Sequence, residues 1–135
     1  MGKKILIAAT NYGVWGEELQ APWDILGKAG HDLTLMTPRG LKPLSLVISV
    51  DPEFDDPIQH YKTNPLEVCN RVKEPQAGQE WANPIKYTDA KMADYDAIGL
   101  TGGLGAMLDL GGNPALHRLL LEAFYSDKLI GALCY

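Results

Sequence analysis

The segment Leu129-Ile-Gly-Ala-Leu-Cys-Tyr135 decides how the rest of the sequence is interpreted. Residues 129–133 are an apolar run after a Ser-Asp-Lys turn, which is typical of a buried strand in a parallel sheet. Cys134 then stands at the carboxyl end of that strand, where open α/β sheets place their ligand sites. A sharp turn there would expose the sulfur beside backbone N–H groups that can hold an anion.

Three further apolar runs predict strands upstream of this segment. They cover residues 4–9, 32–36 and 97–100, and each is short, apolar and followed by a turn or glycine-bearing loop. A parallel strand needs a crossover connection to its next neighbour, and the sequence ends at Tyr135. We therefore expect these residues to be the N-terminal portion of a longer fold.

Helical patterns separate the predicted strands. Apolar residues recur every three or four positions over residues 17–29, and Gly30 follows as a left-handed cap. Residues 114–125 show a second such pattern, with Asn113 as its N-cap and proline at its first position. Strands that alternate with helices predict an α/β fold, with a flavodoxin-like, doubly wound, mainly parallel sheet in three α/β/α layers.

Residues 41–94 interrupt this pattern, and we interpret them as an irregular insertion within a single domain that spans residues 1–135. The insertion contains three shorter patterns. Residues 44–50 predict an edge strand or hairpin arm, and residues 65–73 predict a helix that Asn64 caps and Pro75 stops. Residues 89–94 predict one more helical turn.

Composition excludes several classes of function. The net charge of −5 and the lack of a Lys/Arg cluster argue against nucleic-acid binding, and no apolar run approaches the roughly 20 residues of a membrane span. Cys69 and Cys134 form neither a disulfide framework nor a metal-ligand spacing, so we expect no metal, no other cofactor and a reducing cytoplasmic location. Cys69 lies on a helical stripe and is expected in the core.

Four segments, in order, resemble the DJ-1/PfpI superfamily, within the type 1 glutamine amidotransferase-like fold. The first is Tyr-Gly-Val-Trp-Gly-Glu-Glu-Leu-Gln-Ala-Pro at residues 12–22, and the second is Ala-Gly-His-Asp-Leu-Thr-Leu-Met-Thr-Pro-Arg-Gly at residues 29–40. The third, residues 94–110, contains the Thr-Gly-Gly-Leu-Gly loop, and the fourth is the terminal strand at residues 129–134. The likeness is greatest to the Hsp31-like chaperone and glyoxalase branch, and it extends over essentially the whole chain.

The resemblance implies roles for particular residues. Cys134 takes the position of the family's reactive cysteine, and Glu18 that of the carboxyl group that hydrogen-bonds it. Gly103 and Leu104 lie on the loop that supplies a backbone N–H to an oxyanion. As candidates for lining the substrate pocket we name three aromatic residues, with ordinary aromatic packing as the alternative for the first two: Tyr12, Trp15 and Tyr135.

These residue types give a coherent reaction. The thiolate is the nucleophilic form of cysteine, and backbone dipoles favour it. Two adjacent anions repel each other, so a carboxyl group beside a thiolate is expected to be protonated and can act as general acid. Attack on an aldehyde or acyl carbon produces an oxyanion that loop N–H groups can stabilise.

Two departures from the family pattern restrict the chemistry. Enzymatic members commonly carry histidine after the nucleophile, where this chain has Tyr135, and the Hsp31-like glycine loop usually reads Gly-His-Gly, where this chain has Leu104. The remaining histidines match neither position, so no Cys-His-acid triad can be built from this chain. The Cys134–Glu18 pair that remains resembles the isonitrile hydratases in lacking the histidine.

Simpler interpretations stay open for each candidate. Cys134 could be inert core, Glu18 could be an ordinary first-turn helix carboxylate, and residues 101–105 could suggest phosphate binding. The loop lacks the Lys and Ser/Thr of a P-loop, however, so close approach of its backbone to Cys134 is the preferred interpretation.

The leading functional hypothesis is a cysteine-dependent enzyme, a lyase, hydratase or hydrolase that acts on a small electrophile such as a 2-oxoaldehyde. The alternatives are a non-enzymatic stress chaperone or a redox sensor in which Cys134 oxidises to a sulfinate, and an isonitrile hydratase-like or amidotransferase-like subunit. We expect a small-molecule substrate, a C-terminal fragment or second polypeptide that completes the fold, and, from the resemblance, a homodimer.

Overall fold

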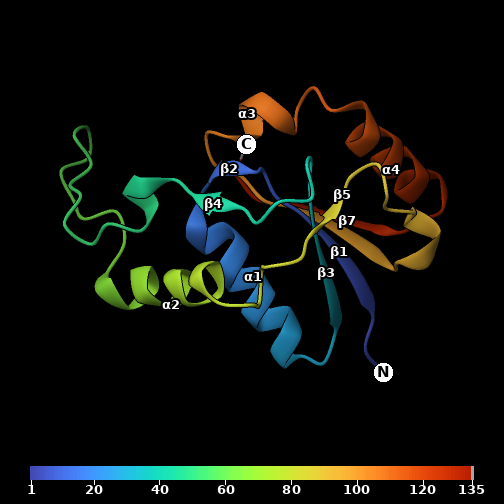
Figure 1. Ribbon diagram of the computed structural model, residues 1–135, viewed down its shortest axis with the longest axis horizontal. Helices are drawn as coiled ribbons and strands as arrows, with labels where there is room; N and C mark the ends of the chain where they lie inside the picture. The colour runs from blue at the N-terminus through green and yellow to red at the C-terminus, as the bar shows by residue number, and fades with distance from the viewer. Residues whose placement is uncertain (135) are drawn as a thin grey trace.

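The protein is described by a computed structural model that covers residues 1–134, and its centre is a five-stranded parallel sheet (Figure 1). The strand order across the sheet is β5-β3-β1-β6-β7. In chain order these strands are β1 (Lys4–Ala8), β3 (Asp32–Thr37), β5 (Ile85–Lys86), β6 (Ala97–Leu100) and β7 (Leu129–Ala132). The predicted doubly wound parallel sheet is confirmed, because the chain extends from β1 to β3 on one side and to β6 and β7 on the other.

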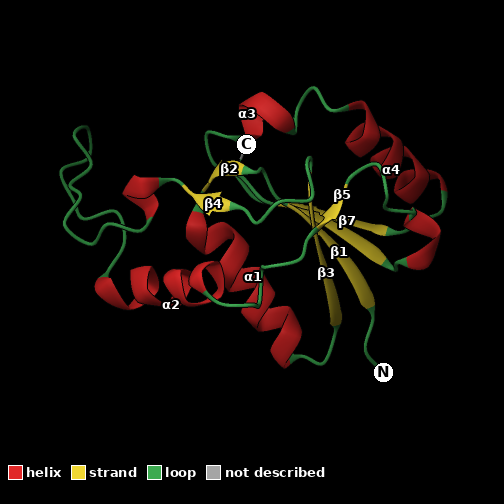
Figure 2. Cartoon of the chain, viewed as in Figure 1, coloured by secondary structure: helices red, strands yellow, loops and turns green. Residues whose placement is uncertain are grey.

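Helices cover both faces of the sheet (Figure 2). The alternation of side chains along β1 assigns Ile5, Ile7 and Ala9 to one core cluster and Leu6 and Ala8 to the other. The first cluster includes residues of helices α1 (Gly16–Lys28) and α2 (Leu66–Ala77), and the second includes residues of helix α4 (Pro114–Tyr125). The three-layer α/β/α prediction is thereby confirmed for the described residues.

The helix predicted over residues 17–29 agrees with α1 to within one residue at each end, and the helix predicted over 114–125 is α4. The side chain of Asn113 caps α4, as expected, by accepting hydrogen bonds from the N–H groups of Ala115 and Leu116, at 3.0 and 3.3 Å. These boundaries were predictable because the cap and the apolar stripe lie in the same short window.

Two details of the predicted helix at 65–73 are wrong. Pro75 does not stop α2, which continues to Ala77; Pro75 sits buried in the last turn, where only one backbone hydrogen bond is lost. Asn64 does not cap the helix, because its side chain donates to the backbone carbonyl of Ser49 at 2.9 Å. That bond ties the start of α2 to the segment around Ser49, which lies far away in sequence.

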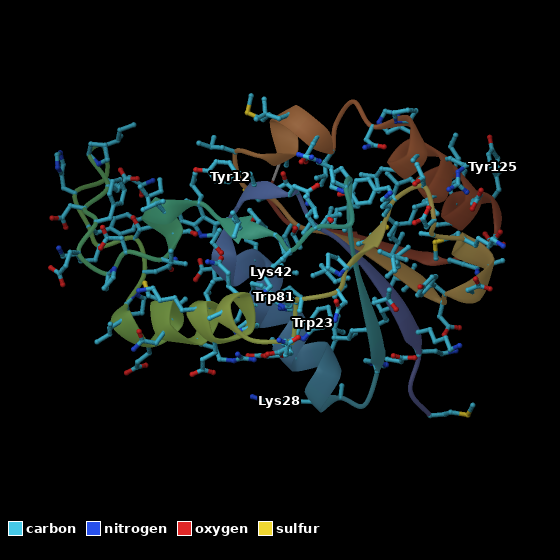
Figure 3. All side chains as sticks on the ribbon, viewed as in Figure 1. Tyr12, Trp23, Lys28, Lys42, Trp81 and Tyr125 are labelled. Carbon is cyan, nitrogen blue, oxygen red and sulfur yellow. The ribbon has the colours of Figure 1, made fainter. Side chains whose placement is uncertain are left out.

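Helix α2 packs on the outside of α1. Arg71 of α2 donates two hydrogen bonds to the carboxylate of Asp24 on α1, one of them from Nε at 2.8 Å. Burial opposes ionisation of Asp24, but the Arg71 hydrogen bonds outweigh it, and the pKa of Asp24 is lowered. Trp23 of α1 and Trp81, which follows α2, pack against the same core cluster (Figure 3).

The segment 41–94 contains more regular structure than predicted. Strand β4 (Leu44–Ser45) pairs in parallel with β2 (Tyr12–Val14), a strand in a segment expected to be a loop. The strand predicted over 44–50 is limited to β4, and the 3₁₀ turn η1 (Val47–Ser49) follows it. A second 3₁₀ turn, η2 (Met92–Asp94), replaces the helical turn predicted at 89–94.

The terminal strand β7 is parallel to β6 as predicted, but the prediction that it is buried is wrong. All four of its residues are exposed, because β7 is the edge strand of the sheet and the nearby helix α4 leaves most of its surface uncovered. The amino-acid pattern of a fully buried strand is therefore present without the layers that would bury it. None of the helices within residues 1–134 is long and apolar enough to cross a membrane.

Candidate active site

Cys134 lies directly beyond β7, at the edge of the sheet where its parallel strands end. The preceding residue, Leu133, extends the ladder by donating its N–H to the carbonyl of Leu100 at 3.0 Å. Cys134 itself has φ of +65°, a left-handed conformation that is uncommon for a residue with a side chain. The backbone therefore leaves the extended conformation of the strand at Cys134, and the residue is exposed.

The second cysteine is in a different environment. Cys69 is fully buried on α2, as expected, and its Sγ lies 3.8 Å from the carbonyl oxygen of Asn64. Burial raises the pKa of the Cys69 thiol, which favours the neutral, unreactive form. Of the two sulfurs, only that of Cys134 is accessible to a reagent in solution.

Glu18 lies in the first turn of α1, and contacts with two loops determine where that helix begins. The N–H of Trp15 donates to the carbonyl of Gly102 at 3.2 Å, and the N–H of Gly16 donates to Oγ of Ser49 at 3.1 Å. These bonds serve the start of a helix that has no side-chain cap at Trp15. They also hold the helix start against the loop that follows β6.

Glu18 and Cys134 meet at Gly102. Oε2 of Glu18 accepts a hydrogen bond from the N–H of Gly102 at 3.1 Å. A Cβ atom added to Gly102 would lie 2.5 Å from Glu18 Oε2, 2.5 Å from Cys134 Cβ and 3.1 Å from Cys134 Sγ. The carboxyl group and the sulfur are thus on the same side of Gly102, and only a residue without a side chain fits between them.

The rest of the glycine loop lies against the backbone of β2 and of Trp15, which follows it. Gly103 has φ of +107°, and a Cβ there would come within 2.4 Å of both the carbonyl oxygen of Gly13 and the nitrogen of Trp15. Close approach of two backbones, and not a phosphate cradle, accounts for glycine at this position. Within residues 1–134 the N–H groups of Gly103 and Leu104 donate to no acceptor.

A cavity of about 370 Å³ opens beside the Glu18–Cys134 pair. Its volume is in the range of sites for small ligands. The residues that line it come from four separate segments of the chain: Trp15, Glu18, Leu46, Ile48, Gly103, Leu104, Met107 and Cys134. The structure therefore brings together five of the residues selected from the sequence, which are Trp15, Glu18, Gly103, Leu104 and Cys134.

The other two candidates are not part of this cavity as described. Tyr12 is 60% exposed on β2 and is not among the lining residues (Figure 3). Tyr135 lies outside the described residues. None of the three histidines lines the cavity, and His31 and His117 contact the backbone of Lys3 and Gly111 instead. Within residues 1–134, no group of three or more His, Cys, Asp or Glu side chains could hold a metal ion.

Sequence reasoning missed three residues that line the cavity, Leu46, Ile48 and Met107. The expected close approach of the 101–105 loop to Cys134 is made by Gly102. Leu46 and Ile48 follow β4, which reaches the site only because it pairs with β2. Met107 belongs to the short helix α3 (Ala106–Asp109), which continues the glycine loop. The apolar run at 44–50 was a usable signal for the first two, but nothing local indicated that it would lie near Cys134.

Several solved structures resemble this one. The Rapid Encystment Protein 24 kDa of Francisella tularensis superimposes with a TM-score of 0.76 at 21% identity, covering 98% of this chain and 58% of its own. Glyoxalase III from Candida albicans gives 0.69 at 19% identity, with 98% and 56% covered. DJ-1beta of Drosophila melanogaster gives 0.66 at 20% identity, with 99% and 56% covered.

At these identities the comparisons show a shared fold, and the predicted resemblance to DJ-1/PfpI proteins is confirmed at that level. The chain spans 56–58% of the length of these three structures. No protein-family model matches the sequence, and no curated protein matches it either.

Proposed function

We propose that the chain carries the reactive centre of a cysteine-dependent enzyme that acts on a small electrophile such as a 2-oxoaldehyde. Cys134 is the nucleophile and Glu18 is its proton partner. The observation that carries the proposal is the convergence of these two side chains on the position that a Cβ at Gly102 would occupy, beside a small cavity.

The accessible thiol and the acid suit the two halves of a carbonyl addition. The thiolate of Cys134 attacks the aldehyde carbon, a sulfur–carbon bond forms, and the carbonyl oxygen takes a proton from the carboxyl group of Glu18. The free N–H groups of Gly103 and Leu104 lie on the loop beside the sulfur and can stabilise the oxyanion before that transfer.

The resulting carboxylate of Glu18 can complete an internal redox reaction. It removes the proton from the former aldehyde carbon, and the electron pair moves onto the adjacent carbonyl oxygen to give an enediolate. The hydroxyl proton passes from the first oxygen to the second, and return of the carbon-bound proton to the second carbon leaves a thioester on Cys134. Water then cleaves the thioester, which releases a 2-hydroxy acid and restores the thiolate. The overall reaction adds one water to the 2-oxoaldehyde and needs no external oxidant or reductant.

The name of one structural neighbour supports the choice of substrate class. The Candida albicans protein is named glyoxalase III, and this chain shares its fold over 56% of that protein. The histidine that usually follows the nucleophile in enzymatic relatives is absent here, as is the histidine of the glycine loop, so we assign the proton transfers to Glu18.

The test is turnover of methylglyoxal, followed by formation of lactate. Cys134→Ser should abolish turnover with an unchanged thermal midpoint, because the exposed sulfur supports no packing. Glu18→Gln should lower turnover roughly 100-fold, since the amide can still accept the Gly102 bond but cannot donate an acidic proton. Cys69→Ser is the matched control and should retain turnover. Retention of full activity by Cys134→Ser would refute the proposal.

The accessibility of Cys134 also favours a second candidate function, a redox sensor. Two equivalents of peroxide would convert the thiolate first to a sulfenate and then to a sulfinate, with one water released at each step. Titration with peroxide, followed by mass spectrometry of the peptides, separates the two functions. Selective oxidation of Cys134 over Cys69 without methylglyoxal turnover would support the sensor and count against the enzyme.

A further inference from the structure

Apart from its reactive pair, the cavity beside Cys134 is lined almost entirely by apolar groups. Five apolar side chains surround it, from Trp15, Leu46, Ile48, Leu104 and Met107. The only ionisable side chains among the lining residues of the described chain are those of Glu18 and Cys134. No Lys, Arg or His within residues 1–134 lines the cavity, so an anionic substituent would meet no positive charge there.

The one polar atom of Trp15 is already engaged elsewhere. Its Nε1–H donates to Oε1 of Glu17 at 3.3 Å, and Glu17 is not among the residues that line the cavity. Trp15 therefore offers ring carbons to a ligand and no hydrogen-bond donor. Leu104 and Met107, at 61% and 76% exposed, leave apolar surface that an incoming substituent can cover.

Selectivity follows from these surroundings. An aromatic or aliphatic substituent that buries roughly 60 Å² of apolar surface would bind about tenfold tighter than one that buries none. A carboxylate at the same place would lose hydration without a compensating partner, and it would approach both the thiolate and the acidic side chain. Both effects favour the aromatic or aliphatic substituent over the carboxylate.

Building on the proposed function, we propose that this site selects uncharged electrophiles that carry an aromatic or aliphatic substituent and rejects analogues that carry a carboxylate or phosphate. Among 2-oxoaldehydes, the class would be the aryl and alkyl glyoxals. The selectivity resides in the apolar lining, and it does not require that the reaction proceed beyond addition to sulfur.

The test uses two maleimides that differ only in charge and apolarity, N-benzylmaleimide and N-carboxymethylmaleimide. The thiolate adds to one alkene carbon, the carbon–carbon π bond is lost, the neighbouring carbon takes a proton from water, and no group leaves. Mass spectrometry of the Cys134 peptide gives each rate constant, which is divided by the rate with 2-mercaptoethanol to remove intrinsic reactivity. The normalised ratio should favour the benzyl reagent at least tenfold.

A charge placed at the rim provides the specific control. Leu104→Lys should raise the normalised rate of the carboxymethyl reagent about tenfold, because the ammonium group supplies the missing cation. Leu108→Lys adds the same charge four residues further on, at a residue that is 84% exposed and does not line the cavity, and should leave the ratio unchanged. Met107→Lys serves as a second rim variant if Leu104→Lys does not fold.

Two results would overturn the inference. The first is a normalised benzyl-to-carboxymethyl rate ratio within threefold of unity in the unmodified chain. The second is an equal change of that ratio in Leu108→Lys and Leu104→Lys, which would assign the effect to the net charge of −5. Failure of the proposed function is distinguishable, because a chain without methylglyoxal turnover would still show the reagent selectivity.

Discussion

Replacement of Gly102 by alanine should lower turnover, by displacing Cys134 and Glu18, far more than it lowers the free energy of unfolding. Gly102 does not adopt a positive φ, so alanine fits its backbone and only the added methyl group perturbs the site. That methyl group would lie 2.5 Å from both Cys134 Cβ and Glu18 Oε2, where carbon atoms in contact are ordinarily about 3.5–4.0 Å apart.

The size of the effect follows from these distances. Each contact must lengthen by about 1 Å, and Cys134 Cβ is bonded directly to the backbone, so relief there requires movement of the turn that follows β7. The carboxyl group of Glu18 can rotate away, but it then loses its bond to the Gly102 N–H. Misplacement of reacting groups by 1 Å costs about 100-fold in rate, whereas overpacking by one methyl group costs about 1–3 kcal/mol.

The assay measures methylglyoxal turnover and the N-benzylmaleimide rate of Cys134 in the same preparation, with the free energy of unfolding from urea titration. Gly99→Ala is the matched control, because Gly99 lies in β6 and a Cβ there would have no atom within 4 Å. We expect turnover to fall about 100-fold in Gly102→Ala and to be unchanged in Gly99→Ala. A folded Gly102→Ala variant with full turnover would refute the reasoning, since the two side chains would not need this geometry.

Two further predictions concern stability and association. Folding lowers the pKa of Asp24 below its ordinary 3.8, so the ion pair with Arg71 stabilises the fold above that pH and is lost as the pH falls below it. Asp24→Asn should therefore lower the free energy of unfolding in urea by about 1–2 kcal/mol at pH 7 and by much less at pH 2. An equal loss at the two pH values would contradict this. We also propose that the open edge of β7 is where a second copy of the chain pairs. Light scattering should then show Ile130→Lys lowering self-association at least tenfold and Leu121→Lys, on α4, having little effect.

The sheet and its main helices could be predicted because local sequence determines them. The strands at 4–9, 32–36 and 97–100 are apolar runs too short to be helices, and the helices at 17–29 and 114–125 combine an apolar stripe with a terminal signal. Their order, strand-helix-strand, then leaves few topologies. Local pattern and global fold agree in these segments, so little information beyond the sequence was needed.

The errors fall where tertiary contacts override local signals. Asn64 has the chemistry of a helix cap, but a bond to the carbonyl of Ser49, 15 residues away, takes its side chain. Pro75 is tolerated in α2 because it lies in the last turn and is buried. The apolar pattern of β7 indicates two covered faces, but β7 is an edge strand whose four residues are exposed in the described part of the chain.

The proximity of Glu18 and Cys134 was expected from the resemblance, but the contacts that bring the two side chains together were not. The sequence selected Glu18 and Cys134 by position, yet it gave no reason why side chains 116 positions apart should keep a fixed separation. Gly102 provides that reason, because its N–H binds the carboxyl group and its missing side chain admits the sulfur.

Gly102 follows β6, which lies between β1 and β7 in the sheet, and Glu18 belongs to the helix that leaves the carboxyl end of β1 by way of β2. The distance from acid to sulfur is therefore determined by the spacing of three neighbouring strands, about 4.8 Å each, and by the loop contacts at Trp15. A site held in this way depends on the rigidity of the core and on little else. Changes in the exposed loop at 51–62 should accordingly leave the reactivity of Cys134 intact, whereas a single methyl group at Gly102 should not.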